Sequence, residues 1–135
     1  MFAVMHAFAD GELPALHELE AEVMAEVWRQ DGESTVRAVM EALNARREKD
    51  RAYTTYMTIM ARLDRKGLLS RRREGKTDVY RPIVSHAQYL ERRAEHEVGA
   101  LVQEFGDAAL VHFARQMNQL DPKRRDQLRR LARRA

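Results

Sequence analysis

Hydrophobic residues recur every three or four positions between residues 51 and 67, the spacing at which side chains share one face of an α-helix. This spacing predicts an amphipathic helix whose apolar side packs on a core. Gly67 also suits the left-handed position that ends many helices. The residues expected on the apolar side are Ala52, Tyr56, Ile59, Met60, Leu63 and Gly67.

The opposite side of this helix lacks the Glu, Lys and Gln that a surface exposed only to water favours. Threonine hydroxyls can hydrogen-bond base edges or phosphates, and apolar methyl groups can pack on the methyl of thymine. We interpret this side as a DNA-reading face, and the alternative is a solvated face that happens to be rich in threonine. Its residues are Thr54, Met57, Thr58, Ala61 and Arg65.

The residue pattern changes after Gly67 to two short runs that favour β-strands, 68–74 and 79–83. They flank a polar turn that contains Gly75, which predicts a β-hairpin. Several of the hairpin side chains are basic. A helix followed by a basic hairpin is typical of winged-helix proteins, in which the helix enters the major groove and the hairpin lies against the DNA backbone or minor groove.

The same apolar periodicity predicts two helices before this stretch and three after it. The first covers 13–28 and ends at Asp31-Gly32, and the second is capped by Ser34 or Thr35. Ser85 to Gln88 has the form of a capping box that starts a fourth helix, which Gly106 ends. Asp107 is expected to cap the fifth helix, and Asp121-Pro122 starts the sixth.

Each of the last three helices offers only one thin apolar stripe, and about 50 residues without a sheet bury three such stripes poorly on their own. We therefore predict that this part pairs with a second copy of the chain. The alternative is a helical cap on the first domain. The residues predicted to form the dimer contact are Leu90, Val98, Leu101, Val102, Phe105, Leu110, Phe113, Met117, Leu128 and Leu131.

The chain is thus expected to be mainly α-helical, with a winged helix-turn-helix domain of three helices and a two- or three-stranded wing, followed by a three-helix dimerisation domain. The predicted boundaries are a flexible tail at 1–12, the winged helix at 13–83 and the dimerisation domain at 84–135. No stretch is apolar for the roughly 20 residues that a membrane span needs. We therefore expect a cytoplasmic protein without membrane insertion.

Charge is distributed unevenly along the chain, whose formal net charge is +3. Residues 1–45 contain 2 basic and 9 acidic residues, residues 46–81 contain 12 and 5, and residues 82–135 contain 10 and 7. The surplus of positive charge over 46–81 coincides with the helix and the hairpin, as expected where phosphates are neutralised. The alternative is a solvated charged face.

No pattern of catalytic or metal-binding residues is present. The chain has no cysteine, so thiolate metal sites, disulfides and cysteine nucleophiles are excluded. None of the five histidines pairs with another at helical spacing, and no phosphate-binding glycine loop or nucleophile motif occurs. We predict a protein that is not an enzyme and that uses no metal or other cofactor.

The sequence resembles the penicillinase-repressor family, the BlaI, MecI and CopY type of transcriptional repressor, over roughly residues 16–120. The most specific part of the resemblance is Ala52-Tyr53-Thr54-Thr55, Met57-Thr58, Arg62-Leu63 and Lys66-Gly67-Leu68. Earlier matching positions are Leu16-His17-Glu18-Leu19-Glu20, Val23-Met24, Val27-Trp28, Thr35-Val36-Arg37, Val39 and Ala42-Leu43, and a weaker match lies at Leu110-Val111-His112-Phe113.

This resemblance implies a homodimer that binds a dyad operator in double-stranded DNA and represses transcription. It implies that Thr54, Thr55, Met57 and Thr58 lie at the major groove and that Arg71 to Arg73 and Lys76 lie in the wing. With their basic and aromatic neighbours, the full set of expected DNA-binding residues is Arg51, Tyr53, Thr54, Thr55, Met57, Thr58, Arg62, Arg65, Arg71, Arg72, Arg73 and Lys76.

The resemblance also implies a mode of induction. In β-lactam-responsive members, a membrane-bound sensor metalloprotease leads to cleavage of the repressor before a Phe in the C-terminal domain. The matching bond here is His112–Phe113, where the best-known relatives have Asn before the bond. The partner would be such a sensor or another protease. Copper sensing through thiolates, known in other members, is excluded because the chain has no cysteine.

Two functions follow from these observations. The first is a dimeric operator-binding repressor. The second is a protein-interaction adaptor that uses a winged helix without binding DNA, and salt-sensitive retention on a polyanion column distinguishes the two.

Overall fold

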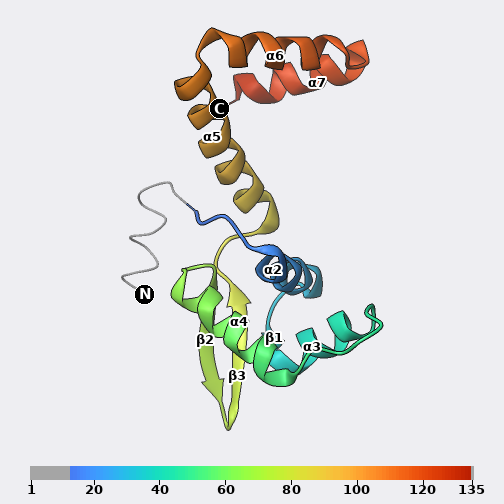
Figure 1. The fold of residues 1–135 in the computed structure, drawn as a ribbon, viewed down its shortest axis with the longest axis vertical. Helices are drawn as coiled ribbons and strands as arrows, with labels where there is room; N and C mark the ends of the chain where they lie inside the picture. Colours follow the sequence, from blue (N-terminus) through green and yellow to red (C-terminus); the bar gives the residue numbers. More distant parts are fainter. Residues whose placement is uncertain (1–12, 135) are drawn as a thin grey trace. The chain divides into compact units, whose positions relative to one another are not determined.

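The computed structural model describes residues 13–134, and the expected flexible tail at 1–12 lies outside this range. In this range, one short strand and three helices precede a β-hairpin, and three helices follow it (Figure 1). The elements are α2 (Glu18–Gln30), β1 (Ser34–Thr35), α3 (Val36–Asn44), α4 (Tyr53–Arg65), β2 (Leu69–Glu74), β3 (Thr77–Pro82), α5 (His86–Phe105), α6 (Asp107–Asn118) and α7 (Pro122–Arg133).

The chain forms two compact units, one up to Ala94 and one from Glu95 onwards. The division falls within α5, whereas the sequence placed the domain boundary between residues 83 and 84. The first two turns of α5 therefore pack as part of the first unit.

The first unit has a winged-helix architecture, which confirms the predicted fold class. Its antiparallel sheet has the strand order β1-β3-β2, so the wing is three-stranded. The short strand β1 joins the sheet through Ser34 opposite Tyr80 and Thr35 opposite Val79. The long β2–β3 ladder runs from Leu69 opposite Pro82 to Glu74 opposite Thr77. In Figure 1 this hairpin extends away from the helices.

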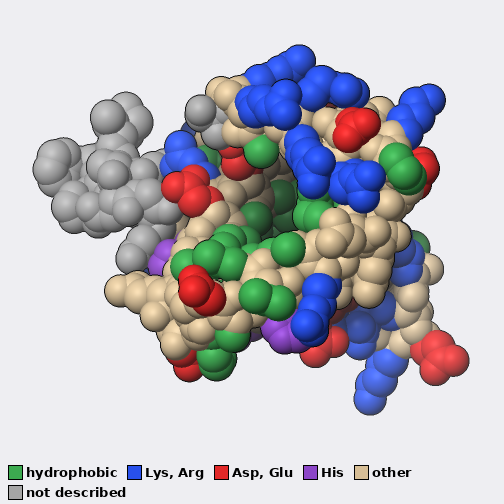
Figure 2. Space-filling model, turned by 90° about the horizontal axis from the view of Figure 1, so that it is seen from above, with side chains coloured by type: hydrophobic (Ala, Val, Ile, Leu, Met, Phe, Trp, Pro, Cys, Tyr) green, Lys and Arg blue, Asp and Glu red, His purple; other side chains and the backbone are tan. Residues whose placement is uncertain are grey.

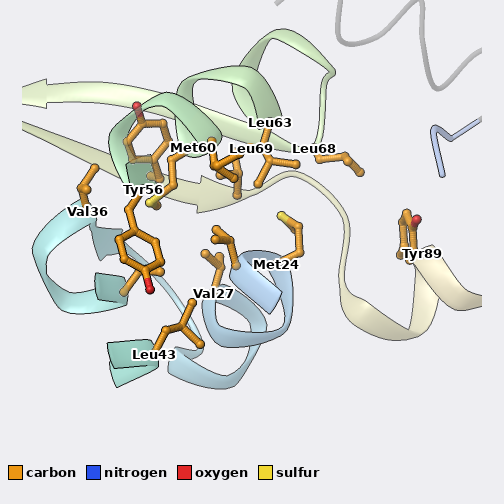
Figure 3. Close-up of a cluster of buried hydrophobic side chains, with 14 of the residues drawn as sticks. Met24, Val27, Val36, Leu43, Tyr56, Met60, Leu63, Leu68, Leu69 and Tyr89 are labelled. Atoms are coloured by element: carbon orange, nitrogen blue, oxygen red, sulfur yellow. The ribbon is translucent and has the colours of Figure 1, made fainter. Parts of the chain in front are cut away.

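A single hydrophobic core holds α4 against the other two helices and the sheet. Figure 3 shows Met24 and Val27 of α2, Leu43 of α3 and Tyr56 and Met60 of α4 among its side chains. All of these are nearly or completely buried. Burial of side chains of this size contributes about 1.5–3 kcal/mol each. The apolar side predicted for α4 is therefore confirmed at Tyr56, Ile59, Met60 and Leu63, while Ala52 precedes the helix and is exposed.

The first helix begins later than its apolar pattern indicated. We predicted a helix from Leu13, but α2 starts at Glu18. Pro14 disfavours helical backbone in the residue before it. The Glu20 carboxylate accepts a hydrogen bond of 3.1 Å from the His17 backbone N–H, which fixes the helix start at that point.

Other local predictions are confirmed with one correction. The Thr35 hydroxyl accepts a hydrogen bond from the Ala38 N–H at 3.1 Å and caps α3. Ser85 and Gln88 form the reciprocal bonds of a capping box. Asp107 does not cap α6, because Gly106 takes a left-handed φ of 60° at the N-cap and the helix starts one residue earlier than expected.

Trp28 attaches the start of α5 to the winged helix. Its indole N–H donates to the Val84 carbonyl at 2.9 Å, and its ring stacks on His86 with centroids 4.6 Å apart. The Tyr89 hydroxyl donates to the Pro14 carbonyl at 3.0 Å. These contacts explain why α5 begins within the first unit.

The second unit buries no side chain within the single chain. Every described residue from 95 to 134 is exposed or half-buried. Across the described part of the chain, no helix has the length and apolarity to cross a lipid bilayer.

Candidate nucleic-acid interface

The outer side of α4 presents the side chains that the sequence predicted. Tyr53 and Met57 are 42% and 44% exposed, and Thr54 and Thr58 are exposed beside them. Thr55 lies deeper and is half-buried. Large apolar side chains this exposed, set among hydroxyls, form a surface that can contact both thymine methyls and base-edge donors or acceptors.

Two basic residues continue this surface toward the end of α4. Arg65 is exposed and Arg62 is half-buried, both in the last turn. Cations there also interact favourably with the negative end of the helix dipole.

A buried ion pair fixes the C-terminal end of α4. The Lys66 ammonium lies 2.8 Å from both carboxylate oxygens of Glu20, whose side chain is 1% exposed. Burial raises the pKa of Glu20, but the hydrogen bonds from Lys66 and the His17 backbone outweigh it and hold that pKa below its usual value. The helix end is thereby tied to α2.

Asn44 fixes the N-terminal end of α4 in a similar way. The Tyr56 hydroxyl donates to Asn44 Oδ1 at 2.7 Å. The same side chain accepts from the Arg51 N–H at 3.1 Å and donates to the Arg51 carbonyl at 3.0 Å. Both ends of the helix are thus held by specific polar contacts.

Arg51 differs from the other residues of the expected interface because it faces the protein. It is half-buried, and its guanidinium lies 3.5 Å from the Glu22 carboxylate. Its backbone positions α4 through Asn44. A phosphate contact of this residue stays a prediction.

The wing arginines differ in how strongly the protein already holds them. Arg72 makes two hydrogen bonds to Glu33, at 2.7 and 2.8 Å, and pairs with Glu74 at 3.0 Å. Arg73 lies 3.3 Å from Asp78. Lys76, at the turn, forms no ion pair with any residue that the structure describes. It is therefore the wing cation most available to a phosphate.

Arg71 interacts instead with the hydroxyl of Tyr80, the residue opposite it in the β2–β3 ladder. This interaction raises the pKa of Arg71. Arg71 remains exposed, so it can still reach a ligand.

We predict that Glu33→Gln strengthens binding to random duplex DNA and steepens its dependence on salt by up to about one unit of slope, because Arg72 is released to a phosphate. Lys76→Gln should make the slope shallower by about one unit. Affinity measured over a salt series tests both. Unchanged slopes in Glu33→Gln would show that Arg72 already contacts DNA despite its pairing.

Arg37 was not among the expected interface residues. Its guanidinium carbon lies 5.7 Å from the centre of the Tyr53 ring, within the range of a cation–π contact. It lies on α3, and only the tertiary packing of α3 on α4 brings it to this surface. The sequence offered no signal for it beyond one exposed arginine on a helix.

No group of acidic, histidine or cysteine side chains in the described range could hold a metal ion. The perturbed pKa values of Glu20 and Glu26 belong to carboxylates buried against cations inside the fold. The polar groups that the structure brings together on α4 and the wing are suited to binding a polyanion.

Comparison with known proteins agrees with this geometry. The chain is 41% identical over 106 residues to the transcriptional regulator BlaI of Mycobacterium tuberculosis, in the strains CDC 1551 / Oshkosh and ATCC 25618 / H37Rv. These alignments cover 76% of this chain and 73% of each relative.

Two solved structures also match over 58% of this chain and 92% of the solved chain, at 27% identity. One is the solution structure of the DNA-binding domain of the repressor BlaI, with a TM-score of 0.49. The other is the monomeric form of Bacillus licheniformis BlaI in complex with the blaP half-operator, with a TM-score of 0.47.

The family described as penicillinase repressor matches residues 16–134, which is nearly the whole chain. This match and the BlaI relatives confirm the resemblance that the sequence indicated. The protein therefore belongs to the penicillinase repressor family.

Proposed function

We propose that this protein is a homodimeric repressor that reads a dyad operator with α4 and holds the DNA backbone with its wing. Its family consists of transcriptional regulators and is not enzymatic, which confirms the expectation that the chain is not an enzyme. The observation that carries the proposal is the exposed face of Tyr53, Thr54, Met57 and Thr58 beside a cationic hairpin.

The side chains of α4 and of the wing suit them to different contacts with DNA. The hydroxyls and methyls of α4 distinguish base pairs in the major groove, whereas arginine and lysine in the wing contact phosphates irrespective of sequence. The polar contacts at Asn44 and Lys66 hold α4 in one position, so its side chains do not need to be ordered on binding.

Dimerisation is supported by the apolar surface of the second unit. A hollow of about 400 Å³ is lined by Leu101, Phe105, Ala108, Ala109, His112 and Phe113. Leu101, Phe105 and Leu110 are each at least 40% exposed. Figure 2 shows hydrophobic side chains gathered around a hollow on the face it draws. Exposed apolar surface of this kind marks an interaction site, and a second copy of the unit would cover it.

Relief by proteolysis is part of the proposal. His112–Phe113 lies in the middle of α6, with His112 exposed and Phe113 half-buried. A protease needs an extended substrate, so cleavage by a membrane-bound sensor metalloprotease or another protease requires local opening of α6. Cleavage there would separate Phe113, the rest of α6 and α7 from the other residues that line the hollow.

We predict that Met57→Ala weakens binding to the selected operator by about 1–3 kcal/mol while binding to random duplex changes little, because the side chain contacts bases. The operator is first obtained by sequencing genomic fragments that the protein retains. Gln116→Ala, at an exposed position of α6 that belongs to neither the expected DNA-binding residues nor the expected dimer contact, serves as the control. Equal losses on operator and random DNA would contradict the assignment of this face, and a wild-type protein that retains no duplex would favour the adaptor.

A further inference from the structure

A second concentration of positive charge, besides the one over residues 46–81, lies on the last helix. Residues 122–134 contain seven basic residues and a single acidic one, Asp126. The remaining 122 residues contain 17 basic and 20 acidic residues, so without α7 the chain would be slightly acidic. The basic residues are Lys123, Arg124, Arg125, Arg129, Arg130, Arg133 and Arg134.

Part of this charge lies on one face of α7 around a shallow depression. A hollow of about 320 Å³ is lined by Arg124, Gln127, Arg130, Leu131 and Arg134, which recur at the spacing of one helical face. All five residues are exposed. Three guanidinium groups thus border one open space on the surface.

These arginines are not neutralised by the protein. Within residues 13–134, neither Arg124, Arg130 nor Arg134 forms an ion pair, whereas Arg72 and Lys66 of the first unit are paired with carboxylates. Keeping like charges together without counter-charges is unfavourable, and an anionic ligand would relieve that repulsion.

The chemistry of the face indicates which anion it suits. Guanidinium groups bind phosphate oxygens through two parallel hydrogen bonds, and Gln127 adds a neutral donor. The face offers Leu131 but no aromatic side chain, so it lacks both the apolar anchors of a membrane-surface helix and the buried aromatic anchors of a protein interface. A row of phosphates on a nucleic acid backbone fits it better than a bilayer or an acidic peptide.

We propose that the face formed by Arg124, Gln127, Arg130 and Arg134 is a second phosphate-binding site, which engages duplex DNA without reading its sequence. The inference rests on the proposed DNA-binding function but concerns a surface separate from α4 and the wing. It adds affinity for any duplex and increases the number of counterions released, so it leaves discrimination between operator and random DNA to α4.

The test compares two double variants of the full-length protein that lose the same charge from the same helix. Arg130→Gln with Arg134→Gln removes two guanidinium groups from the face, whereas Arg129→Gln with Arg133→Gln removes two from the other side of α7. Affinity for a random duplex about two helical turns long is measured over a salt series. Light scattering on both variants confirms that the oligomeric state is unchanged.

We expect the Arg130/Arg134 variant to bind random duplex with a salt slope about two units shallower than the wild type, since each lost phosphate contact removes about 0.9 units. The Arg129/Arg133 variant should change the slope by less than half as much. Equal changes of slope in both variants would mean that only the total charge of the helix matters, and this would overturn the proposed site. No change of slope in either variant would overturn it as well.

Two further measurements are needed. The first distinguishes DNA from other anionic ligands, and the second distinguishes failure of this inference from failure of the proposed repressor function. The Arg130/Arg134 variant could lose binding to phosphatidylglycerol vesicles or to polyglutamate while its salt slope on random duplex stays unchanged. That result would assign the face to a membrane or an acidic protein and overturn the proposal. Failure of the wild type to select any duplex would instead contradict the proposed repressor function. An operator-selecting wild type with an unaltered Arg130/Arg134 variant would contradict this inference alone.

Discussion

Leu101→Asp is expected to convert the proposed dimer to a monomer and to lower its affinity for the proposed dyad operator by about 100-fold or more. Leu101 lines the apolar hollow of the second unit and is 40% exposed in the single chain. In a dimer, the aspartate carboxylate at position 101 would be buried without a partner. Its desolvation costs far more free energy than the loss of the apolar contact of Leu101. Light scattering and binding to whole and half operators measure the two effects.

The loss of affinity is large because a dimer binds its second half-site as an intramolecular event. Linking two binding modules raises affinity by about 10²–10⁴ over one module without any new contact. A monomeric variant should therefore bind a half-site like the wild type and lose only the advantage on the complete dyad.

Gln103→Asp provides the matched control for this variant. It places the same charge in the same helix two residues away, on a side chain that is exposed and does not line the hollow. It should remain dimeric and bind the dyad normally. A Leu101→Asp protein that stays dimeric would show that another surface holds the two chains together.

The parts of the fold that the sequence predicted are those that depend on neighbouring residues. The helical face of α4 follows from a repeat of three and four positions, and the Thr35 cap and the Ser85–Gln88 capping box each span three residues. Gly67, with a φ of 84°, ends α4 as expected. Local periodicity and capping chemistry were sufficient at each of these points.

The parts that the sequence did not predict depend on residues far apart in the chain. β1 has only two residues, too few for a strand pattern, and forms only because β3 pairs with it. The bond between Glu33 and Arg72 spans 39 positions and changes which wing cations are free. A run of basic residues looks uniform in a sequence, and only packing shows which of them the protein already neutralises.

The burial of Glu20 and Glu26 could not be predicted from the sequence either, because acidic residues on helices usually face solvent. Glu26 is 1% exposed and accepts hydrogen bonds from Arg29, Arg46 and Gln30. The Arg29 hydrogen bond is the main cause that lowers the pKa of Glu26, against the effect of burial. Buried ion pairs of this kind affect the free energy of unfolding and its dependence on pH. The pair of Glu20 with Lys66 also holds the end of α4 in position.

Lys66→Met is expected to lower the free energy of unfolding at neutral pH by about 3–5 kcal/mol, because it leaves the buried Glu20 carboxylate without its cation. Denaturant unfolding measures the change. Arg65→Met, which removes the neighbouring exposed cation, should change stability by less than about 0.5 kcal/mol. Glu20→Gln combined with Lys66→Met should recover most of the loss, since no buried charge then remains unpaired.

The same ion pair determines how stability responds to acid. Because the pKa of Glu20 is lower in the folded state than in the unfolded chain, its contribution is complete above the unfolded pKa and is lost as the pH falls through the folded value. In Lys66→Met, only the His17 N–H still opposes the effect of burial, so the pKa of Glu20 rises above its wild-type value and the carboxyl protonates more readily. The difference in stability between wild type and Lys66→Met should therefore shrink as the pH falls below the usual range of a glutamate. A difference that stays constant from neutral to acid pH would mean that Lys66 stabilises the helix end through its packed alkyl chain rather than through the charge of Glu20.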